Sequence, residues 1–409
     1  MNKKNSFVFS ILMILLGSVS AQELAKKYDQ GLSKMKNNDY LGAIADFSSI
    51  IKQSAYYYDA YLQRASCYEQ IKKYDLALSD YNMAIEKNPD FHEAYYARGI
   101  LYLNIKKDEV KALSDLKNAI VIKANYSPAL LSLADLYKQQ KNYNQAIATY
   151  SKVIAINPNQ MQAYFGRALA YRQIEQKKEA VNDLDKTIRI NNTNVEAYRE
   201  RAELHTEMGK YVEAIRDYSK VIDLNAKTKE ILAQRADIYY LTKQYQLALA
   251  DYNDLINNFK VKSPEYYAKR GVCYTSLGDS LTAQKEFTKA LALNRSDYKI
   301  YIYRAENAVK MNKFTSAIAD YKRAIELNPK AWDTYFSRAK AYMEAKKYDL
   351  AIEDWNVVLK KNNKNAEAYF MRGSCKDKLN DRDGACQDLQ RAANFQHQEA
   401  INIVNKYCK

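Results

Sequence analysis

The chain has 409 residues, a formal net charge of +15, ten glycines and five prolines. The length alone would allow two or three domains. However, Gly and Pro are scarce, alternating Val/Ile/Thr runs are missing and helix formers dominate. This composition argues against several mixed domains and favours one continuous helical array.

The first residues form a separate segment. Lys3 and Lys4 precede an apolar run over residues 7–19, and residues 19–21 (Val-Ser-Ala) are small. This pattern is typical of a secretory signal peptide, which we assign to residues 1–21. A retained membrane anchor is the alternative, but the run is shorter than the roughly 20 residues that span a bilayer. We expect an exported protein, periplasmic or extracellular after cleavage.

Loss of Lys3 and Lys4 with this segment leaves a formal charge of +13. Outside the cytoplasm, a basic protein is better matched to acidic proteins, lipid head groups or anionic polysaccharide than to nucleic acid.

The rest of the chain repeats an alanine every 34 or 35 residues. The series is Ala43, Ala77, Ala112, Ala146, Ala180, Ala214, Ala248, Ala283, Ala317, Ala351 and Ala385. It defines eleven repeats, which begin near residues 24, 58, 92, 127, 161, 195, 229, 264, 298, 332 and 366. Positions within a repeat are counted from these starts.

Side-chain size alternates in the same way in every repeat. Positions 8 and 20 are always small, which favours a close helix crossing there. Positions 4, 11 and 24 are mostly aromatic or Leu, so the large residues form one helical stripe before position 15 and a second after position 17. Each repeat is therefore predicted to be a helix, a turn near positions 15–17 and a second helix, and most of the 37 tyrosines are predicted to be structural.

A charged pair also repeats. Position 7 is Arg in nine repeats, and position 23 is Asp or Glu in all but one. The two positions lie at similar heights in an antiparallel hairpin, so we predict an Arg–carboxylate pair that fixes helix register. Repeat 4 has Leu133 and Thr149 instead, which favours pairing within a repeat over pairing with the next one. The alternative role for these arginines is ligand capture.

The run Tyr-x-x-Arg-Gly/Ala-x-x-Tyr, Tyr-x-x-Ala-Ile-x-Asp-Tyr and Ala-Ile-x-x-Asn-Pro resembles the tetratricopeptide repeat, most clearly over residues 58–91 and 298–331. The resemblance extends over about residues 24–395. Repeats 1, 3 and 11 depart from it, through Lys27 and Lys34, a residue inserted before Ala112, and Lys376. It implies an all-α, right-handed superhelical solenoid of about eleven repeats over residues 22–395, with a capping helix over residues 396–409.

The resemblance further implies that the first helices line a concave groove, into which positions 2, 5, 9, 12 and 13 point. We expect this groove to hold an extended or helical segment of another protein, although some apolar position-5 residues would instead pack on their neighbours. The candidate groove residues are Tyr96, Leu131, Phe165, Arg172, Arg199, Ile302, Phe336 and Phe370.

A second candidate surface is basic. Lysines recur in or beside the turn inside each repeat, for example at Lys72, Lys141, Lys243 and Lys346. They are either ordinary solvated turn residues or a basic edge that docks on anionic lipid or polysaccharide.

Motifs of catalysis are missing. The three histidines share no spacing, and no Gly-rich phosphate loop, HExxH or Cys-x-x-Cys is present. The sequence therefore predicts no enzyme activity, no cofactor and no metal site.

The five cysteines fall into two groups. Cys67, Cys273 and Cys375 share position 10 and are predicted to be buried free thiols. The ending, with Gly-Ala-Cys386 and a later Cys408, resembles exported bacterial repeat proteins and makes these two a disulfide candidate. Two free thiols and a Cys375–Cys386 bond remain the alternatives.

Overall fold

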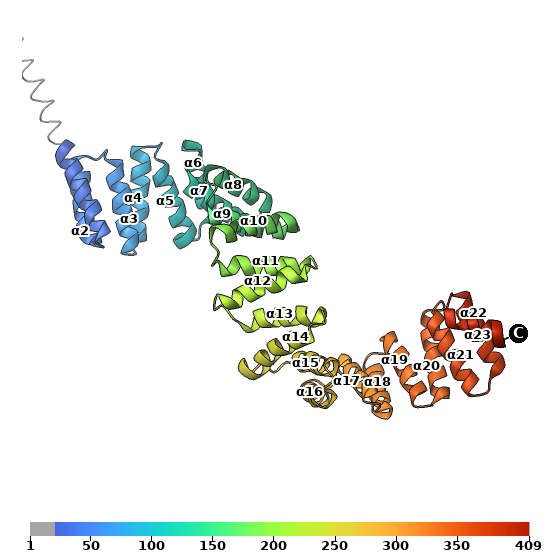
Figure 1. Cartoon of the computed structure of the whole chain (residues 1–409). Coiled ribbons are helices and arrows are strands. Elements are labelled where there is room, and N and C mark those ends of the chain that lie inside the picture. The colour runs from blue at the N-terminus through green and yellow to red at the C-terminus, as the bar shows by residue number, and fades with distance from the viewer. Residues whose placement is uncertain (1–20, 409) are drawn as a thin grey trace, which may run out of the picture. The chain divides into compact units, whose positions relative to one another are not determined.

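The computed structural model describes residues 21–408, which form helices and short turns without a strand. All of the predicted signal peptide except Ala21 lies outside the described residues. The chain divides into two compact units, an N-terminal unit of residues 1–200 and a C-terminal unit of residues 201–409. Within each unit the helices form a series of antiparallel hairpins (Figure 1).

The N-terminal unit is helical from residue 21 to residue 36. It continues with α2 (Tyr40–Gln53), α3 (Tyr58–Gln70), α4 (Tyr74–Lys87), α5 (His92–Leu101), η1 (Tyr102–Lys106), α6 (Glu109–Ile122), α7 (Ser127–Gln139), α8 (Tyr143–Ile156), α9 (Met161–Gln173) and α10 (Lys177–Ile190). The boundary between the units lies inside α11 (Val195–Glu207).

The C-terminal unit contains α12 (Tyr211–Asp223), α13 (Lys229–Leu241), α14 (Tyr245–Asn253), η2 (Asp254–Asn258), α15 (Pro264–Ser276), α16 (Ser280–Leu293), α17 (Tyr298–Lys310), α18 (Phe314–Leu327), α19 (Trp332–Glu344), α20 (Tyr348–Lys361), α21 (Ala366–Lys378), α22 (Arg382–Asn394) and α23 (Gln398–Tyr407).

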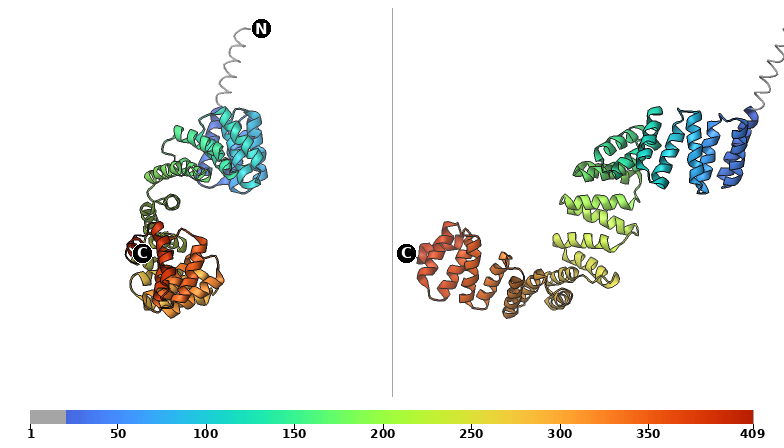
Figure 2. Two further views of the ribbon diagram at one scale, coloured as in Figure 1. Left: turned by 90° about the vertical axis from the view of Figure 1, so that its right-hand side faces the viewer. Right: turned by 180° about the vertical axis from the view of Figure 1, so that it is seen from behind.

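Hairpins stack in sequence order within each unit. The two helices of a repeat pack together, as α3 does with α4 and α15 with α16, and the second helix packs on the first helix of the next repeat (Figure 2). The predicted all-α fold of repeated helical hairpins is confirmed.

The helices of one repeat cross closely at positions 8 and 20, as their small residues predict. A Cβ placed on Gly373 would lie 3.2 Å from the carbonyl oxygen of Ala385. The same construction at Gly99 gives 3.4 Å to the carbonyl oxygen of Ala112. A larger side chain at either position would push the helices apart.

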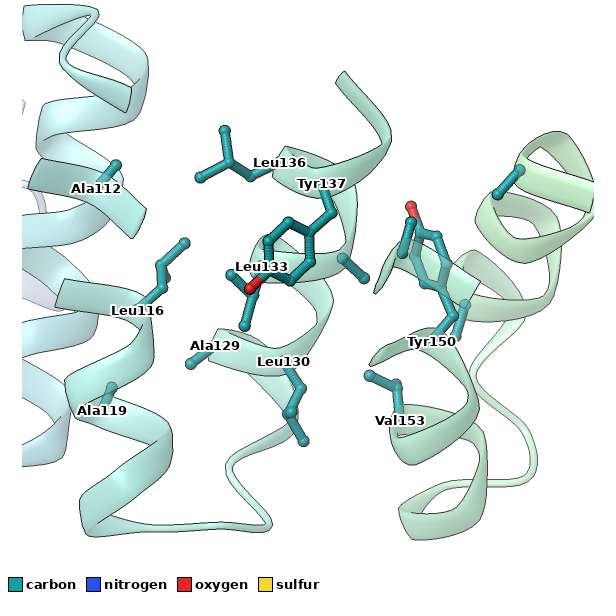
Figure 3. Close-up of a cluster of buried hydrophobic side chains, with 14 residues drawn as sticks. Ala112, Leu116, Ala119, Ala129, Leu130, Leu133, Leu136, Tyr137, Tyr150 and Val153 are labelled. Atoms are coloured by element: carbon teal, nitrogen blue, oxygen red, sulfur yellow. The ribbon is translucent and has the colours of Figure 1, made fainter. Parts of the chain in front are cut away.

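The core is shared between consecutive repeats. Leu116 of α6, Leu130 and Leu136 of α7, and Tyr150 of α8 are buried in one cluster (Figure 3). Because α7 contributes side chains to both neighbours, no hairpin buries its apolar surface alone. Stability therefore depends on stacking, as expected of repeat proteins.

Turns inside the repeats adopt a common backbone conformation. Position 15 has a positive φ in ten repeats and position 16 has one in repeat 3, but only Gly209 and Gly278 are glycines there. The predicted turn near positions 15–17 is confirmed.

Two repeats have 35 residues in place of 34, namely residues 92–126 and 229–263. Each of them contains a π-helical segment, η1 in the first and η2 in the second. A π turn accommodates one more residue than an α turn, so the extra residue is absorbed locally and the surrounding helices keep their contacts.

The predicted Arg–carboxylate pairs form within all nine repeats that have the arginine. Arg64, for example, donates two hydrogen bonds to Asp80 at 2.7 and 2.8 Å. The other pairs are Arg98–Asp115, Arg167–Asp183, Arg201–Asp217, Arg235–Asp251, Arg270–Glu286, Arg304–Asp320, Arg338–Asp354 and Arg372–Asp388. Their acidic members are buried, so the pairs are structural elements of the hairpins.

Several of these arginines also reach the preceding repeat. Arg64 donates to Ser48 at 2.9 Å, and Arg235 donates to Ser219 at 2.9 Å. Arg372 donates to Asn356 at 2.6 Å. The acceptor is at position 25, where small polar residues recur. A single guanidinium thus connects three helices.

Two of the lysines that depart from the repeat pattern take part in the same pairs. Lys34 lies 2.7 Å from Asp46 in repeat 1, which has no Arg at position 7. Lys376 lies 2.8 Å from Asp388, beside Arg372. Both lysines occupy position 11, where other repeats have an aromatic ring. Lys34 takes the place of the missing arginine, and Lys376 is a second cation on the buried carboxylate.

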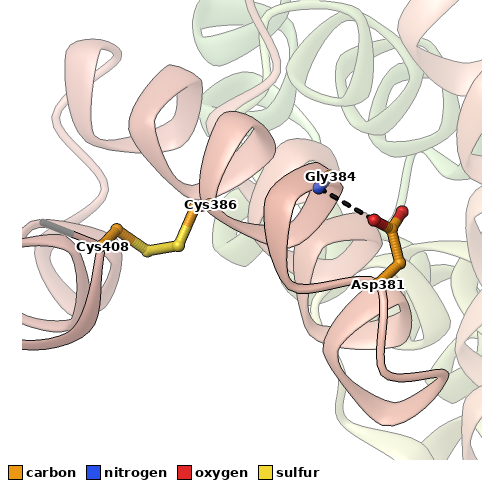
Figure 4. The surroundings of a disulfide bond; sticks show 4 residues. All are labelled: Asp381, Gly384, Cys386 and Cys408. Atoms are coloured by element: carbon orange, nitrogen blue, oxygen red, sulfur yellow. Dashed lines mark hydrogen bonds between the residues drawn. A yellow bond between two sulfur atoms is a disulfide. The ribbon is translucent and has the colours of Figure 1, made fainter.

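The C-terminal helix α23 is fastened at both ends. His397 caps its first turn by accepting a hydrogen bond from the Ala400 amide at 3.3 Å. At its other end, Cys408 forms a disulfide with Cys386 of α22, with a Cα–Cα distance of 5.5 Å (Figure 4). Cys67, Cys273 and Cys375 are free and buried, as predicted.

Candidate functional site

The candidate site is the face of the first helices that carries positions 2, 5, 9, 12 and 13, called the A-helix face below. All eight predicted groove residues are half-buried. They belong to α5 (Tyr96), α7 (Leu131), α9 (Phe165 and Arg172), α11 (Arg199), α17 (Ile302), α19 (Phe336) and α21 (Phe370).

In the N-terminal unit, aromatic rings from the start and the end of repeat 3 meet at this face. Tyr96 approaches Tyr126 edge to face, with ring centroids 5.5 Å apart. Tyr126 also meets His92 at 4.6 Å. Leu131 packs against the buried cluster that contains Leu130 and Tyr150. These side chains are anchored on one side and open on the other, which suits a contact surface.

In the C-terminal unit, two position-5 rings pack on their neighbours, the alternative that the sequence left open. Phe336 meets the buried Trp355 edge to face at 4.9 Å, and the Lys340 ammonium lies 4.8 Å from its centroid. Phe370 stacks on His397 at 4.2 Å. The rings are held in fixed orientations and keep only part of their surface exposed.

The predicted cations of this face are already ion-paired. Arg172 donates to Glu200 at 2.5 Å. Arg199 lies 2.5 Å from Glu196 and 3.6 Å from Glu200. Because these carboxylates neutralise both guanidinium groups, Arg172 and Arg199 do not form an open anion site.

Carboxylates on this face are held by tyrosines that the sequence analysis assigned only to the core. The hydroxyl of Tyr150 donates to Asp135 at 2.5 Å, and that of Tyr252 donates to Asp237 at 2.7 Å. Tyr81 donates in the same way to Glu69. The signal that could have revealed this is a position-24 tyrosine combined with a carboxylate at position 9 or 12 of the same repeat.

The turn lysines are exposed, and several occupy the position with positive φ: Lys72, Lys107, Lys141, Lys243 and Lys346. Others pair with nearby carboxylates. Lys106 lies 2.5 Å from Asp75, and Lys177 lies 3.4 Å from Glu175. The edges of the hairpins therefore carry both free and paired cations.

No metal site forms among residues 21–408, where no three side chains of His, Cys, Asp or Glu gather as ligands. The same residues contain no helix that is both long enough and apolar enough to cross a bilayer. The histidines belong to three separate helix regions and have different neighbours.

Family models described as "TPR repeat" or "Tetratricopeptide repeat" match six stretches of the chain. These are residues 58–91, 134–175, 162–194, 264–297, 303–366 and 367–395. The stretches lie in both units, and residues 58–91 and 264–297 each coincide with one repeat of the structure. This chain is a tetratricopeptide repeat protein.

No curated protein matches the chain. Among solved structures, the C-terminal part of a TPR repeat-containing protein from Cytophaga hutchinsonii is 21% identical, covers 58% of this chain and 97% of its own, and has a TM-score of 0.48. A tetratricopeptide repeat protein from Parabacteroides merdae is 19% identical over 62% of this chain and 98% of its own, with a TM-score of 0.39. MamA is 23% identical over 43% of this chain and 96% of its own, with a TM-score of 0.38.

Proposed function

We propose that this tetratricopeptide repeat protein is a non-enzymatic interaction scaffold, and that its A-helix face binds an extended or helical segment of a partner protein. The observation that carries the proposal is the row of half-buried rings and aliphatic side chains on that face, at Tyr96, Leu131 and Phe165 in the N-terminal unit. Anchored apolar side chains with one open side are what a peptide segment packs against.

The proposal is tested with a pair of matched double variants used as bait in envelope extracts of the producing cell. Leu131→Lys with Phe165→Lys places charge on the A-helix face. Val110→Lys with Val121→Lys places the same charge on α6, where the two valines are 79% and 82% exposed. We expect the first variant to bind a discrete partner protein about thirtyfold more weakly, since each of the two removed apolar contacts contributes about 1 kcal/mol, and the second to retain it.

Melting curves of both variants serve as the folding control. Equal retention of the protein by both variants would contradict the proposal.

We also propose that the protein is exported after cleavage of residues 1–21. The Cys386–Cys408 disulfide supports this, because such bonds persist in oxidising compartments. Mass spectrometry of the N-terminus of the mature protein tests it: a peptide that begins at Gln22 is expected, and an intact leader would contradict it.

A second candidate function is docking of the basic edge on an anionic envelope surface. The exposed turn lysines Lys72, Lys107 and Lys141 favour it. Each adopts a left-handed backbone conformation that glycine or asparagine adopts more readily, so the conformation of the turn does not explain why lysine occurs there. Binding to vesicles with anionic lipid should weaken as salt is raised. Binding that salt does not change, or no binding, would eliminate this candidate.

A further inference from the structure

The charge of the A-helix face has the opposite sign to that of the chain. Over repeats 2 to 4, positions 2, 5, 9, 12 and 13 carry four carboxylates and one lysine, although the whole chain has a net charge of +15. The carboxylates are Asp59, Glu69, Glu93 and Asp135, and the lysine is Lys138.

Among the described residues, only one of these four carboxylates, Asp135, is paired with a lysine or arginine. Lys138 pairs with Asp135 at 3.1 Å, and the only ionisable partner of Glu93 among the described residues is His92, at 2.8 Å. Within residues 21–408, no lysine or arginine pairs with Asp59 or Glu69.

Burial disfavours the charged forms of two of these carboxylates, and repulsion from a neighbouring carboxylate adds to this effect in one of them. Burial raises the pKa of Asp59, and the nearby charge of Glu93 raises it further. Burial also raises the pKa of Glu69, against the effect of the hydrogen bond from Tyr81. A cation brought to this face would relieve both costs, because it stabilises the ionised carboxylates.

Two of the carboxylates are already oriented. Tyr81 extends from α4 to hold Glu69 on α3, and Tyr150 extends from α8 to hold Asp135 on α7. Glu69 keeps acceptor capacity for a second donor, and Asp135, which also accepts from Lys138, keeps its Oδ2 for a further one. Such fixed acceptors lose little freedom when a partner binds.

Apolar side chains separate the charges. Leu62, Tyr96 and Leu131 are half-buried at position 5 of repeats 2, 3 and 4. The face therefore offers alternating apolar and acidic contacts along successive first helices. An extended chain that alternates apolar and cationic side chains would match it in both charge and pattern.

We propose that the partner segment bound by the N-terminal unit is basic, and that its lysine or arginine side chains pair with Glu69, Asp135 and the Asp59–Glu93 pair while its apolar side chains pack on the leucines and Tyr96. This inference rests on the proposed function and specifies the chemistry of the partner.

The probes are three fluorescent peptides of about twelve residues, long enough to extend over roughly 40 Å. Leu alternates with Lys in the first peptide, with Glu in the second and with Ser in the third. Binding to the full chain is measured by fluorescence anisotropy at two salt concentrations. The Lys peptide should bind most tightly, and its affinity should fall as salt rises.

The decisive comparison uses two charge-matched double variants. Glu69→Gln with Asp135→Asn removes two carboxylates from the A-helix face. At each position it keeps an amide oxygen that can accept the hydrogen bond from the tyrosine hydroxyl. Glu86→Gln with Glu179→Gln removes two exposed carboxylates from the second helices α4 and α10. We expect the first variant to bind the Lys peptide about tenfold more weakly, as expected for the loss of two ion pairs, one half-buried at Glu69 and one exposed at Asp135, and the second to bind it as the wild type does.

Equal loss in both variants, or preference for the Glu or Ser peptide, would overturn the inference. In either case the proposed function stands if Leu131→Lys with Phe165→Lys still abolishes binding of the preferred peptide. If that variant changes the binding of none of the three peptides, the proposed function fails as well.

Discussion

At the scale of single residues, Arg235 shows how one side chain holds several helices. It donates to both oxygens of Asp251, at 2.7 and 2.8 Å, and to Ser219 of the preceding repeat. Asp251 is only 4% exposed, so its charge is tolerated because the guanidinium is present.

Repeat 4, which has Leu133 and Thr149 in place of the ion pair, shows which substitutions can test the pair in repeat 7. Arg235→Leu should destabilise the C-terminal unit by about 3 kcal/mol, because it leaves Asp251 buried and unpaired. Arg235→Leu with Asp251→Thr copies Leu133 and Thr149 and should recover most of that loss. Denaturant unfolding, together with hydrogen exchange in α13 and α14, measures both effects. A double variant no more stable than the single one would contradict the account.

His205 is the residue whose protonation should affect stability. It occupies position 11, where tyrosine is common, and is 8% exposed with an unpaired Nδ1 among the described residues. Burial lowers its pKa, Arg201 and Lys210 lower it further, and Asp217 and Glu213 oppose them.

Since the pKa of His205 is lower in the folded than in the unfolded chain, its contribution to stability is present above pH 6.5, the ordinary value for histidine. That contribution is lost as the pH falls below this value, because the unfolded chain then binds more protons. His205→Tyr should reduce the fall in melting temperature between about pH 7.5 and pH 5.5. If the melting temperature fell equally in the variant and the wild type, protonation of His205 would not contribute to the pH dependence of stability.

At the scale of secondary-structure elements, the two 35-residue repeats reveal how this fold tolerates an insertion. In the repeat that begins at residue 92, the extra residue lies between Tyr102 and Lys107, and η1 takes it up. Helix α6 then begins at Glu109 and packs on α5 as in the other hairpins. The strain of the insertion is confined to one turn.

This predicts different outcomes for deletions at equivalent positions. Deletion of Asn104, at position 13 of a 35-residue repeat, should leave the melting temperature unchanged or raise it, because the π turn can become an α turn. Deletion of Gln173, at position 13 of a 34-residue repeat, should lower it by several degrees, because the register of α9 shifts. Equal losses in the two deletions would contradict the explanation.

The hairpins could be predicted from the sequence because side-chain size alone determines where helices approach. Ala43 and its counterparts marked the helix crossing. Repeat 4 lacks both the arginine and the carboxylate, with Leu133 and Thr149 in their places, and this joint absence indicated the ion pair within a repeat. Individual polar contacts were harder to foresee. The bond from Arg64 to Ser48 of the preceding repeat and that from Tyr150 to Asp135 within one repeat depend on how helices are rotated about their axes.

The candidate site shows the same limit. The resemblance to tetratricopeptide repeats implied that the position-5 residues share one face, but their environments depend on neighbouring side chains. Phe370 stacks on His397, and Arg172 is neutralised by Glu200. The extra residue before Ala112 was visible as a change of period, whereas its π conformation depends on the packing of α5 and α6.

At the scale of the whole molecule, every described repeat uses its buried surface for stacking, and the A-helix face is where anchored apolar and acidic side chains stay open. Under the proposed function, this distribution separates two tasks: the second helices and the Arg–carboxylate pairs stabilise the stack within each unit, and the first helices bind the partner. The central claim is that partners bind on the first helices.

A photo-crosslinking scan over both helix types tests this claim most directly. A photoreactive amino acid is placed in turn at Tyr96, Leu131 and Ile302 on first helices, and at Val110, Val121 and Val212 on second helices, where these valines are largely exposed. Discrete crosslinks to a partner protein should arise at the first three sites and not at the other three. Crosslinks that arise at the valines, and not at the first-helix sites, would contradict the account.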